Sequence, residues 1–117
     1  MSETDAALKN ELHAVELPLV AALREGAHDV RRQVRCGNFR LDIVDDTTGE
    51  IIECKARGNA ASICAAVGQL RRYRHHIFDP QLAIAVPLVE PEAQWLAEML
   101  KREGIRIIEV SKGAIGI

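Results

Sequence analysis

The amino-acid sequence predicts one α/β domain with a mixed sheet of about five strands flanked by helices, and two observations carry this prediction. Residues 30–56 contain three short segments that read as strands, and after residue 57 segments with helical spacing alternate with short apolar segments. A chain of 117 residues can bury one core, and 48% hydrophobic residues with only 3% aromatic ones predict an aliphatic core. We therefore expect a single domain over residues 1–117.

The N-terminal part of the chain predicts a helix followed by a strand. Residues 1–12 are polar, and we expect them to be loosely ordered. Four apolar residues then share a helical spacing: Leu17, Leu19, Val20 and Leu23. Proline is tolerated only in a first turn, so Pro18 places the start of this helix nearby, and Gly26 ends it. Val30–Cys36 is expected to be a strand with a basic face.

A β-hairpin is expected next. Its strands are Phe39–Val44 and Glu50–Ala56, and the residues between them, Asp45–Gly49, have the composition of a turn. Alternation places three apolar side chains on one face of the first strand: Phe39, Leu41 and Ile43. The acidic side chains around the turn are expected to be solvated: Asp45, Asp46 and Glu50.

The rest of the chain alternates helices with strands. Asn59 can cap a helix that runs to about Ile77. Leu82–Val86 is apolar on both faces, as a central parallel strand should be. A last helix over residues 90–104 and a final strand over residues 105–110 complete the order. A meander followed by helical crossovers predicts antiparallel and then parallel pairing, hence a mixed sheet.

The hairpin also brings charged side chains together. Extending its register outward from the turn places Asp42 opposite Glu53 and Arg40 opposite Lys55, all on one face. Like charges placed directly opposite each other destabilise a sheet, so the two carboxylates need an explanation. A divalent cation such as Mg²⁺ or Mn²⁺ supplies one, because hard cations prefer carboxylate oxygens. The alternative is an exposed hairpin face on which all four charges are solvated.

The spacing of these residues resembles a known signature. Asp42, followed after ten residues by Glu53-Cys54-Lys55, resembles the D-x(n)-(D/E)-x-K motif of the PD-(D/E)XK, or restriction-endonuclease-like, nucleases. Residues 16–20 are similar to the first-helix glutamate motif of Holliday junction resolvases, and Gln69–Tyr73 resembles a Q-x-x-x-Y motif of several nuclease branches, so small resolvase-like and VRR-NUC-like members are the nearest. The expected element order matches that family's αβββαβαβ core. Leu41 departs from the family's usual proline.

The resemblance implies a metal centre and a hydrolytic reaction. Asp42 and Glu53 would hold Mg²⁺ or Mn²⁺, with the backbone carbonyl of Cys54 completing the shell. Glu16 would reach the cation directly or through water, although Pro18 beside it leaves its orientation open. Glu11 is the alternative helix carboxylate for this role.

The remaining candidates would act on the substrate. Lys55 would position or deprotonate the attacking water, or stabilise developing charge, and Gln69 would orient the water or the phosphate. The residues expected to contact nucleic acid are cationic or aromatic: Arg35, Arg40, Arg57, Arg71, Arg72 and Tyr73. Arg74, His75 and His76 extend the same cationic run. The implied function is hydrolysis of phosphodiester bonds in DNA, by endonuclease rather than exonuclease action.

Composition narrows the other classes of function. Three cysteines without a C-x-x-C pair predict neither a disulfide framework nor a zinc or iron–sulfur site. A net charge of −2 and a pI of about 6.1 argue against a nucleic-acid coat protein. The longest apolar run falls short of the roughly 18 residues of a membrane span, and the acidic N-terminus does not resemble a signal peptide. We therefore expect a cytoplasmic protein.

Alternatives remain for activity and assembly. The same fold could serve as a non-catalytic nucleic-acid-binding or assembly module, or as a structural subunit of a larger complex. For the assembly we expect a homodimer, because a single core carries one active site and two-fold dimers are the commonest oligomers. The apolar tail Gly113–Ile117 would lie in the interface; otherwise it continues the last strand of its own sheet. Substrate specificity would come from loops, from dimer geometry or from a protein partner.

Overall fold

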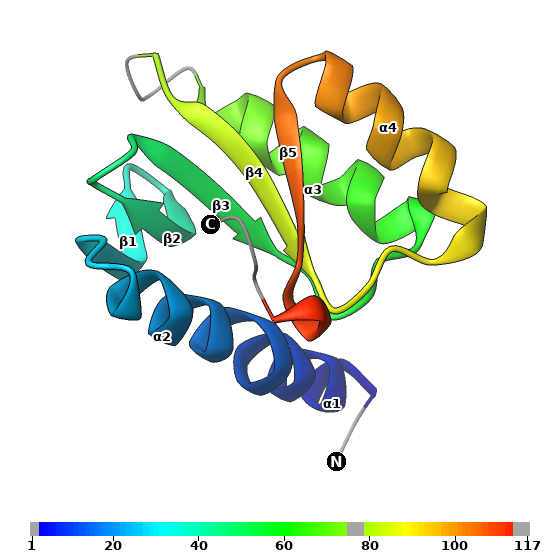
Figure 1. Cartoon of the computed structure of the whole chain (residues 1–117), viewed down its shortest axis with the longest axis horizontal. Helices are drawn as coiled ribbons and strands as arrows, with labels where there is room; N and C mark the ends of the chain where they lie inside the picture. The colour runs from blue at the N-terminus through cyan, green and yellow to red at the C-terminus, as the bar shows by residue number, and fades with distance from the viewer. Residues whose placement is uncertain (1–2, 75–78, 114–117) are drawn as a thin grey trace.

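A computed structural model describes residues 3–74 and 79–113 and contains a five-stranded mixed sheet with helices on both faces (Figure 1). Its elements are α1 (Glu3–Asn10), the π-helical η1 (Glu11–Glu16), α2 (Leu17–Glu25), β1 (Val30–Cys36), β2 (Phe39–Asp45), β3 (Glu50–Cys54), α3 (Ala60–Tyr73), β4 (Gln81–Val86), the 3₁₀ turn η2 (Pro91–Ala93), α4 (Gln94–Arg102), β5 (Ile105–Glu109) and the 3₁₀ turn η3 (Val110–Lys112). The predicted α/β class, the mixed sheet and the number of strands are confirmed.

The strands lie in the order of the sequence, β1-β2-β3-β4-β5. The first three pair antiparallel, whereas β3, β4 and β5 pair parallel, as the meander and the crossovers predict. Two successive crossovers of the same hand that step in the same direction place both of their helices on one face of the sheet. Figure 1 shows α3 and α4 together on that face and the α1–η1–α2 helix on the other.

Each face of the sheet buries its own apolar cluster. On the α2 face, helix residues Val15, Leu19, Val20 and Leu23 pack against strand residues Ile43, Ile52, Cys54, Ala83, Ala85 and Ile108. On the α3 face, helix residues Ile63, Ala66, Leu70, Leu96 and Leu100 pack against strand residues Leu41, Ile51, Leu82, Ile84 and Val86. Because β3 and β4 are covered on both sides, their residues are apolar on both faces, which explains the apolar run predicted to be a central strand.

The N-terminal helix is longer than expected. Residues 3–12 are helical rather than loosely ordered, and the helix continues through Pro18 instead of starting beside it. A proline lacks the N–H of a regular helix and crowds the carbonyl four residues earlier. Here the N–H of Leu17 bonds to the carbonyl of Leu12, five residues back, so a π-helical segment widens the helix just before the proline.

The hairpin register is confirmed near the turn and differs at the open end. Asp45 pairs with Glu50, Val44 with Ile51 and Ile43 with Ile52, as the turn predicts. The β2–β3 ladder then stops, so Asp42 and Glu53 are not opposed as ladder partners, and neither are Arg40 and Lys55. The two strands therefore separate where the sequence places its charges.

The alternation of side chains also inverts at Asp42. Ile43 packs on the α2 face, whereas Leu41 packs on the α3 face with Phe39, so the prediction of one shared face for these three residues is wrong. The neighbouring strand β1 has its distortion at the same level, where Gln33 has a positive φ of 50° and is skipped in the β1–β2 ladder. The pairs on either side keep the same register, so no residue is inserted; Gln33 and Asp42 leave the ladder together, and Val34 and Leu41 lie on the face opposite to Ile43.

The remaining boundaries agree closely with the sequence. Asn59 caps α3 by accepting the N–H of Ser62 at 3.1 Å. The helix ends at Tyr73; its expected end near Ile77, together with His75 and His76, falls outside the described residues, as do residues 114–117 of the apolar tail. Within the described part of the chain, no helix is both long enough and apolar enough to cross a bilayer.

Candidate functional site

The site forms where β2 and β3 separate. The Oδ2 atom of Asp42 accepts the backbone N–H of Cys54 at 2.9 Å, in the place where a carbonyl of β2 would otherwise bond. The N–H of Lys55 points the other way and bonds to the Ala85 carbonyl of β4 at 2.9 Å. Because backbone groups alternate in direction along a strand, the carbonyl of Cys54 points toward β2 and Asp42. The Asp42 carboxylate and the backbone carbonyl of Cys54 therefore both face the opening between β2 and β3.

Glu53 is the least compensated carboxyl group in this opening. Its side chain is only 4% exposed, and its Oε2 atom is buried without a hydrogen-bond partner in the described structure. Burial first, and then the charge of the adjacent Asp42 and a hydrogen bond with it, raise the pKa of Glu53 to about 9, whereas Lys55 opposes the shift. A buried carboxylate beside a second one requires either a proton or a cation.

Two glutamates of the N-terminal helix approach the same place. The π-helical segment puts Glu11 and Glu16, five residues apart, on the same side of the helix. Glu16 is 2% exposed, and both of its oxygens are engaged. Oε1 accepts from Gln33 at 2.7 Å, and Oε2 accepts two N–H groups of Arg32. Glu16 is therefore neutralised by β1.

Glu11 has no such partner. Its carboxyl forms no hydrogen bond or ion pair with any described residue, and it is half-buried. Burial raises the pKa of Glu11 to about 7, with a contribution from Asp42, while Lys55 lowers it. Of the two helix carboxylates that the sequence offers, Glu11 is thus the one with oxygens available, and Glu16 is the one held in place.

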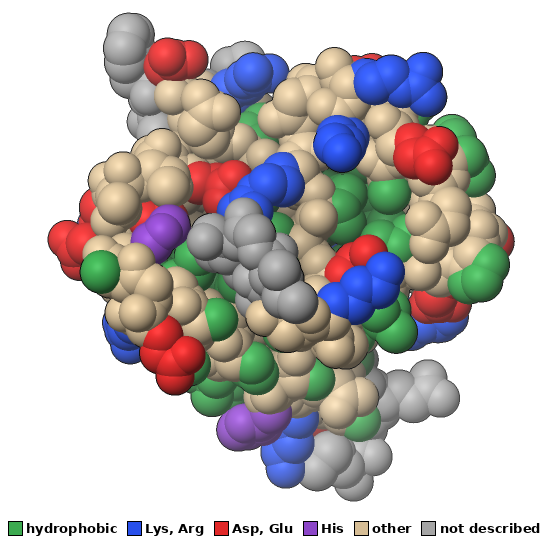
Figure 2. Space-filling model, viewed as in Figure 1, with side chains coloured by type: hydrophobic (Ala, Val, Ile, Leu, Met, Phe, Trp, Pro, Cys, Tyr) green, Lys and Arg blue, Asp and Glu red, His purple; other side chains and the backbone are tan. Residues whose placement is uncertain are grey.

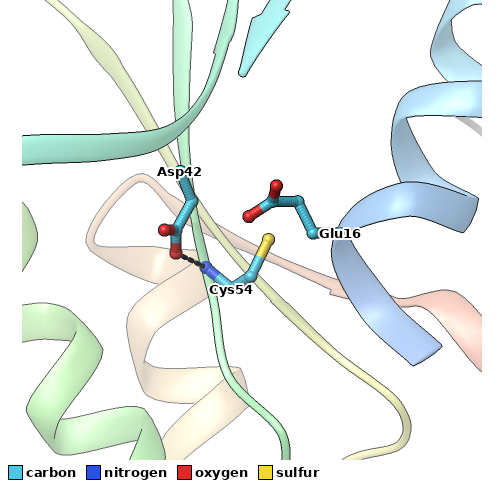
Figure 3. A group of neighbouring side chains, drawn as sticks. All are labelled: Glu16, Asp42 and Cys54. Carbon is cyan, nitrogen blue, oxygen red and sulfur yellow. Dashed lines mark hydrogen bonds between the residues drawn. The ribbon is translucent and has the colours of Figure 1, made fainter. Parts of the chain in front are cut away.

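A second grouping of possible metal donors lies toward the α2 face. Glu16, Asp42 and Cys54 each offer one ligand atom, and these three atoms lie within 4.8 Å of one another. Figure 3 shows the Glu16 carboxylate directed toward Asp42 and the Cys54 thiol directed toward the Glu16 carboxylate. Burial raises the pKa of the Cys54 thiol far above its ordinary value, and the surrounding carboxylates add to this. A protonated thiol and a carboxylate already bound to Arg32 and Gln33 suit a hard cation poorly. The oxygen donors around Glu53 suit one better.

Lys55 borders this opening, whereas no hydrogen bond or ion pair among the described residues joins Gln69 to Asp42, Glu53 or Lys55. Lys55 lies directly after β3, partly exposed, and its charge acts on both Glu53 and Glu11. The Oε1 atom of Gln69, on α3, is buried and has no hydrogen-bond partner among the described residues. Two orphaned acceptors, on Gln69 and Glu53, require a donor or a cation that the protein itself does not provide.

The loop after Lys55 is held by a close backbone contact. An added Cβ at Gly58 would lie 1.9 Å from the carbonyl oxygen of Leu88, so only glycine fits. The carbonyl of Gly58 also accepts the N–H of Glu90 at 2.9 Å. This contact fixes the course of the chain that leaves Lys55.

Tyr73 lies inside the core and not on the surface expected for a nucleic-acid contact. It is 5% exposed, its O–H donates to the Arg40 carbonyl at 3.3 Å, and its ring meets Phe39 edge to face at 5.7 Å. Burial raises the pKa of Tyr73 to about 12, and Glu53 adds to the shift. The phenol therefore joins the packing of α3 to the carboxylate cluster and offers no face for base stacking.

The expected phosphate-binding arginines divide into two groups. Arg57 donates to Glu90 at 2.8 Å, so its charge is already paired. Arg35, Arg40, Arg71 and Arg72 are exposed and form no ion pair with the described acidic side chains. Arg72 lies over the ring of Phe39, 4.4 Å from its centroid. Arginine side chains without an acidic partner among the described residues therefore lie on the β1–β2 hairpin and in the last turn of α3.

Sequence reasoning missed Arg32 and Gln33. Arg32 lies in the strand that was predicted to have a basic face, without a role of its own, and nothing marked Gln33, because a mid-strand glutamine carries no signature of a positive φ. Gln33 also approaches Asp42, with its Nε2 atom 3.5 Å from Oδ1, and so lies between the Glu16 and Asp42 carboxylates. The only signal in the sequence was the expected pairing of the Asp42 and Glu53 carboxylates, because such a pair needs a hydrogen-bond donor or a cation nearby.

Comparisons with known proteins found no relative from which a function could be inferred. No protein-family model matches the chain, and no curated protein or solved structure is significantly similar to it.

Proposed function

We propose that this protein is a metal-dependent nuclease that hydrolyses phosphodiester bonds in DNA. The observation that carries the proposal is the buried Glu53 beside Asp42, with one oxygen unpartnered and Lys55 two residues away. Buried, uncompensated carboxylates in an opening of the fold are characteristic of functional sites. The five-stranded mixed sheet and the order of its elements are compatible with the restriction-endonuclease-like topology that the Asp42…Glu53-Cys54-Lys55 motif suggests.

The residues of the opening suit a divalent cation. Asp42 and Glu53 would hold Mg²⁺ or Mn²⁺ together with the Cys54 carbonyl, which faces the same space, and Glu11 is the helix carboxylate with free oxygens. Such a cation supplies a Lewis acid for the scissile phosphate and lowers the pKa of water. Glu16, tied to Arg32 and Gln33, would instead hold the helix against the strands beside the site.

The other side chains would act on the water and the phosphate. The ammonium group of Lys55 can hold the attacking water or offset charge that develops on the phosphate. The Oε1 atom of Gln69 is an acceptor without a donor and can orient that water. Tyr73 and Glu53 are close enough for the phenol to help orient the carboxyl group.

The test of this proposal is cleavage by the purified protein. Supercoiled plasmid, linear duplex, single-stranded, branched and RNA substrates are incubated with Mg²⁺, Mn²⁺ or EDTA. We expect metal-dependent cleavage of DNA, and a loss of about 10²-fold or more in Lys55→Ala, the usual scale for a proton-transfer or charge-stabilising group. The matched control is Asp46→Asn, which removes an exposed carboxylate of the same hairpin, paired with Arg31.

Two outcomes would contradict the proposal. Undiminished cleavage by Lys55→Ala would assign the activity to another site or to a contaminant. Binding of nucleic acid without cleavage under any metal condition would favour the non-catalytic binding module. In that case the acidic cluster would need a different ligand.

We also propose that the protein acts as a homodimer, since cutting both strands of a duplex requires two sites and a two-fold axis supplies them. The expected interface includes the apolar C-terminal tail, Gly113–Ile117. Light scattering at tens of micromolar on the full chain and on a chain ending at Lys112 tests this. A monomeric mass for the full chain would contradict it.

A further inference from the structure

The tip of the β1–β2 hairpin places two arginines directly opposite each other. Cys36 pairs with Phe39 across the two-residue turn Gly37-Asn38, and the next pair outward from the turn is Arg35 with Arg40. Gly37 has a φ of 60°, the conformation that a glycine-led tight turn of this kind requires. A two-residue turn fixes the register, so the two arginine side chains leave the hairpin from directly opposed positions on one face.

This pairing has no compensating acid. Four other arginines of the described chain have a carboxylate partner: Arg31 with Asp46, Arg32 with Glu16, Arg57 with Glu90 and Arg106 with Glu50. No described acidic side chain pairs with Arg35 or Arg40. Figure 2 shows acidic and basic side chains intermixed on the face it presents. Arg71 and Arg72 also lack an acidic partner among the described residues, but Arg35 and Arg40 are paired with each other across a strand ladder. Directly opposed like charges destabilise a strand pair.

The two arginines also border a hollow of suitable chemistry. A cavity of about 300 Å³ is lined by Arg35, Gly37, Asn38, Phe39 and Arg40. Two guanidinium forks beside a glycine backbone can donate several hydrogen bonds to the oxygens of one phosphate group, and a bound anion would remove the repulsion between the forks. The hollow therefore suits a phosphate better than an apolar ligand.

We propose that the Arg35–Arg40 pair is a phosphate clamp that grips the backbone of duplex DNA next to the bond that is cut. The placement rests on the proposed nuclease function. Arg40 lies two residues from Asp42 on β2, which corresponds to about 7 Å along the strand, or about two nucleotides of B-form rise. The clamp and the acidic opening would thus contact one strand at phosphates about two nucleotides apart.

The surroundings favour duplex over single-stranded DNA. Proteins that bind single strands without sequence preference stack bases on exposed aromatic rings. The one aromatic ring at this tip, Phe39, is half-buried, covered by Arg72 at 4.4 Å and packed against Tyr73. The tip therefore offers guanidinium groups to phosphates and no free aromatic face to bases.

A first experiment tests the anion site without DNA or catalysis. Thermal unfolding is followed in pyrophosphate and in chloride at equal ionic strength, for the wild type, for Arg35→Ala/Arg40→Ala and for Lys101→Ala/Arg102→Ala. The control pair removes the same charge from exposed positions at the end of α4, beside β5 at the other edge of the sheet. We expect pyrophosphate to raise the melting temperature of the wild type and the control by a few degrees more than that of the clamp variant. An equal gain in all three proteins would contradict the clamp.

A second experiment measures DNA affinity by fluorescence anisotropy on a labelled duplex in EDTA, over a range of salt concentrations. Each lost phosphate contact lowers the slope of log K against log salt by about 0.9, so the clamp variant should lose about 2 from that slope and at least about tenfold in affinity. The control variant should match the wild type. Equal weakening in both variants, or equal affinity for a single strand of the same length, would overturn the proposal.

The two proposals can fail separately. If the wild type cleaves DNA but the clamp variant binds the duplex as well as the wild type does, the clamp is wrong and the nuclease stands. If the duplex is bound through Arg35 and Arg40 but never cleaved with Mg²⁺ or Mn²⁺, the clamp stands and the nuclease is wrong.

Discussion

The β2–β3 hairpin carries an aspartate and a glutamate at each end. The carboxylates at the turn have hydrogen-bond donors for their oxygens, whereas those at the open end do not all have them. At the turn, Asp45 faces Glu50, and both are buried. Asp45 accepts from His28 at 2.5 Å and from backbone N–H groups of the turn, while Arg106 donates to both oxygens of Glu50 at 2.6 and 3.1 Å. Each carboxylate at this end has its own donors.

At the open end the compensation is incomplete. Asp42 accepts one backbone N–H, whereas Glu53 keeps a buried oxygen without a partner and a strongly raised pKa. Burial alone therefore does not distinguish a structural acid from a functional one, because all of these side chains except that of Asp42 are buried. What distinguishes them is whether the fold supplies the donors.

The largest expected effect is on cleavage. Glu53→Gln should lower turnover by about 10³-fold, because it removes a charge from the proposed cation site. Glu50→Gln, the same change at the other end of β3, should leave turnover within about threefold once the folded fraction is equal. Rates on linear duplex, normalised by the circular dichroism of each protein, give the comparison. Equal losses of turnover in the two variants would contradict the assignment of Glu53 as a functional acid and Glu50 as a structural one.

The next largest effect is on the free energy of unfolding. Here the substitution at the turn should cost more than the substitution at the open end. Asp45→Ala leaves His28 and the turn N–H groups without their acceptor, and breaking such a buried pair costs about 3 kcal/mol. Glu53→Gln keeps the shape of the side chain and an amide that can still hydrogen-bond to Asp42, so it should change the free energy of unfolding by less than about 1 kcal/mol near pH 5. Urea denaturation at that pH measures both. A larger cost for Glu53→Gln would mean that the open end is structural.

A smaller effect is expected from pH. The pKa of Glu53 rises from 4.5 to about 9 on folding, so the folded protein keeps a proton that the unfolded chain has released in this window. Stability from this group is therefore complete below pH 4.5 and is lost as pH rises toward 9. Each pH unit inside this window costs about 1.4 kcal/mol per retained proton, so between pH 5 and pH 6 alone Glu53→Gln should gain about 1 kcal/mol on the wild type. Denaturation midpoints that stay parallel for both proteins over this range would argue against the raised pKa.

The smallest effect is from metal alone. Millimolar Mg²⁺ should raise the melting temperature of the wild type by a few degrees at pH 8, since a ligand that binds only the folded state stabilises it by mass action. Asp42→Asn should abolish the rise, whereas Asp46→Asn, at an exposed acid paired with Arg31, should keep it. A rise that survives in Asp42→Asn would place the cation elsewhere.

Local features of the fold could be predicted from the sequence because each depends on neighbouring residues. The turn at Asp45–Gly49 determined the hairpin register as far as Ile43 and Ile52. The Asn59 cap determined where α3 begins, and the apolar run before Pro87 identified the central strand β4. Strands followed by crossovers determined the mixed sheet.

The composition of the candidate site was also predictable, but its arrangement was not. The sequence identified Asp42, Glu53 and Lys55 by their spacing, and it left Glu11 and Glu16 as alternatives. Choosing between these two required the positions of Arg32 and Gln33, which engage Glu16 from a strand at the other side of the opening. A helix glutamate carries no local mark of such a partner.

By itself the sequence determined the elements, their order and which acids lie in the hairpin. Only the tertiary structure decided which acids are compensated, since His28 and Arg106 reach Asp45 and Glu50 from distant segments, whereas no described residue reaches the free oxygen of Glu53. It also decided where alternation inverts, through the positive φ of Gln33. The physical reason is the same in each case: propensity and periodicity act over a few residues, whereas charge compensation and strand distortion depend on contacts between residues far apart in the chain.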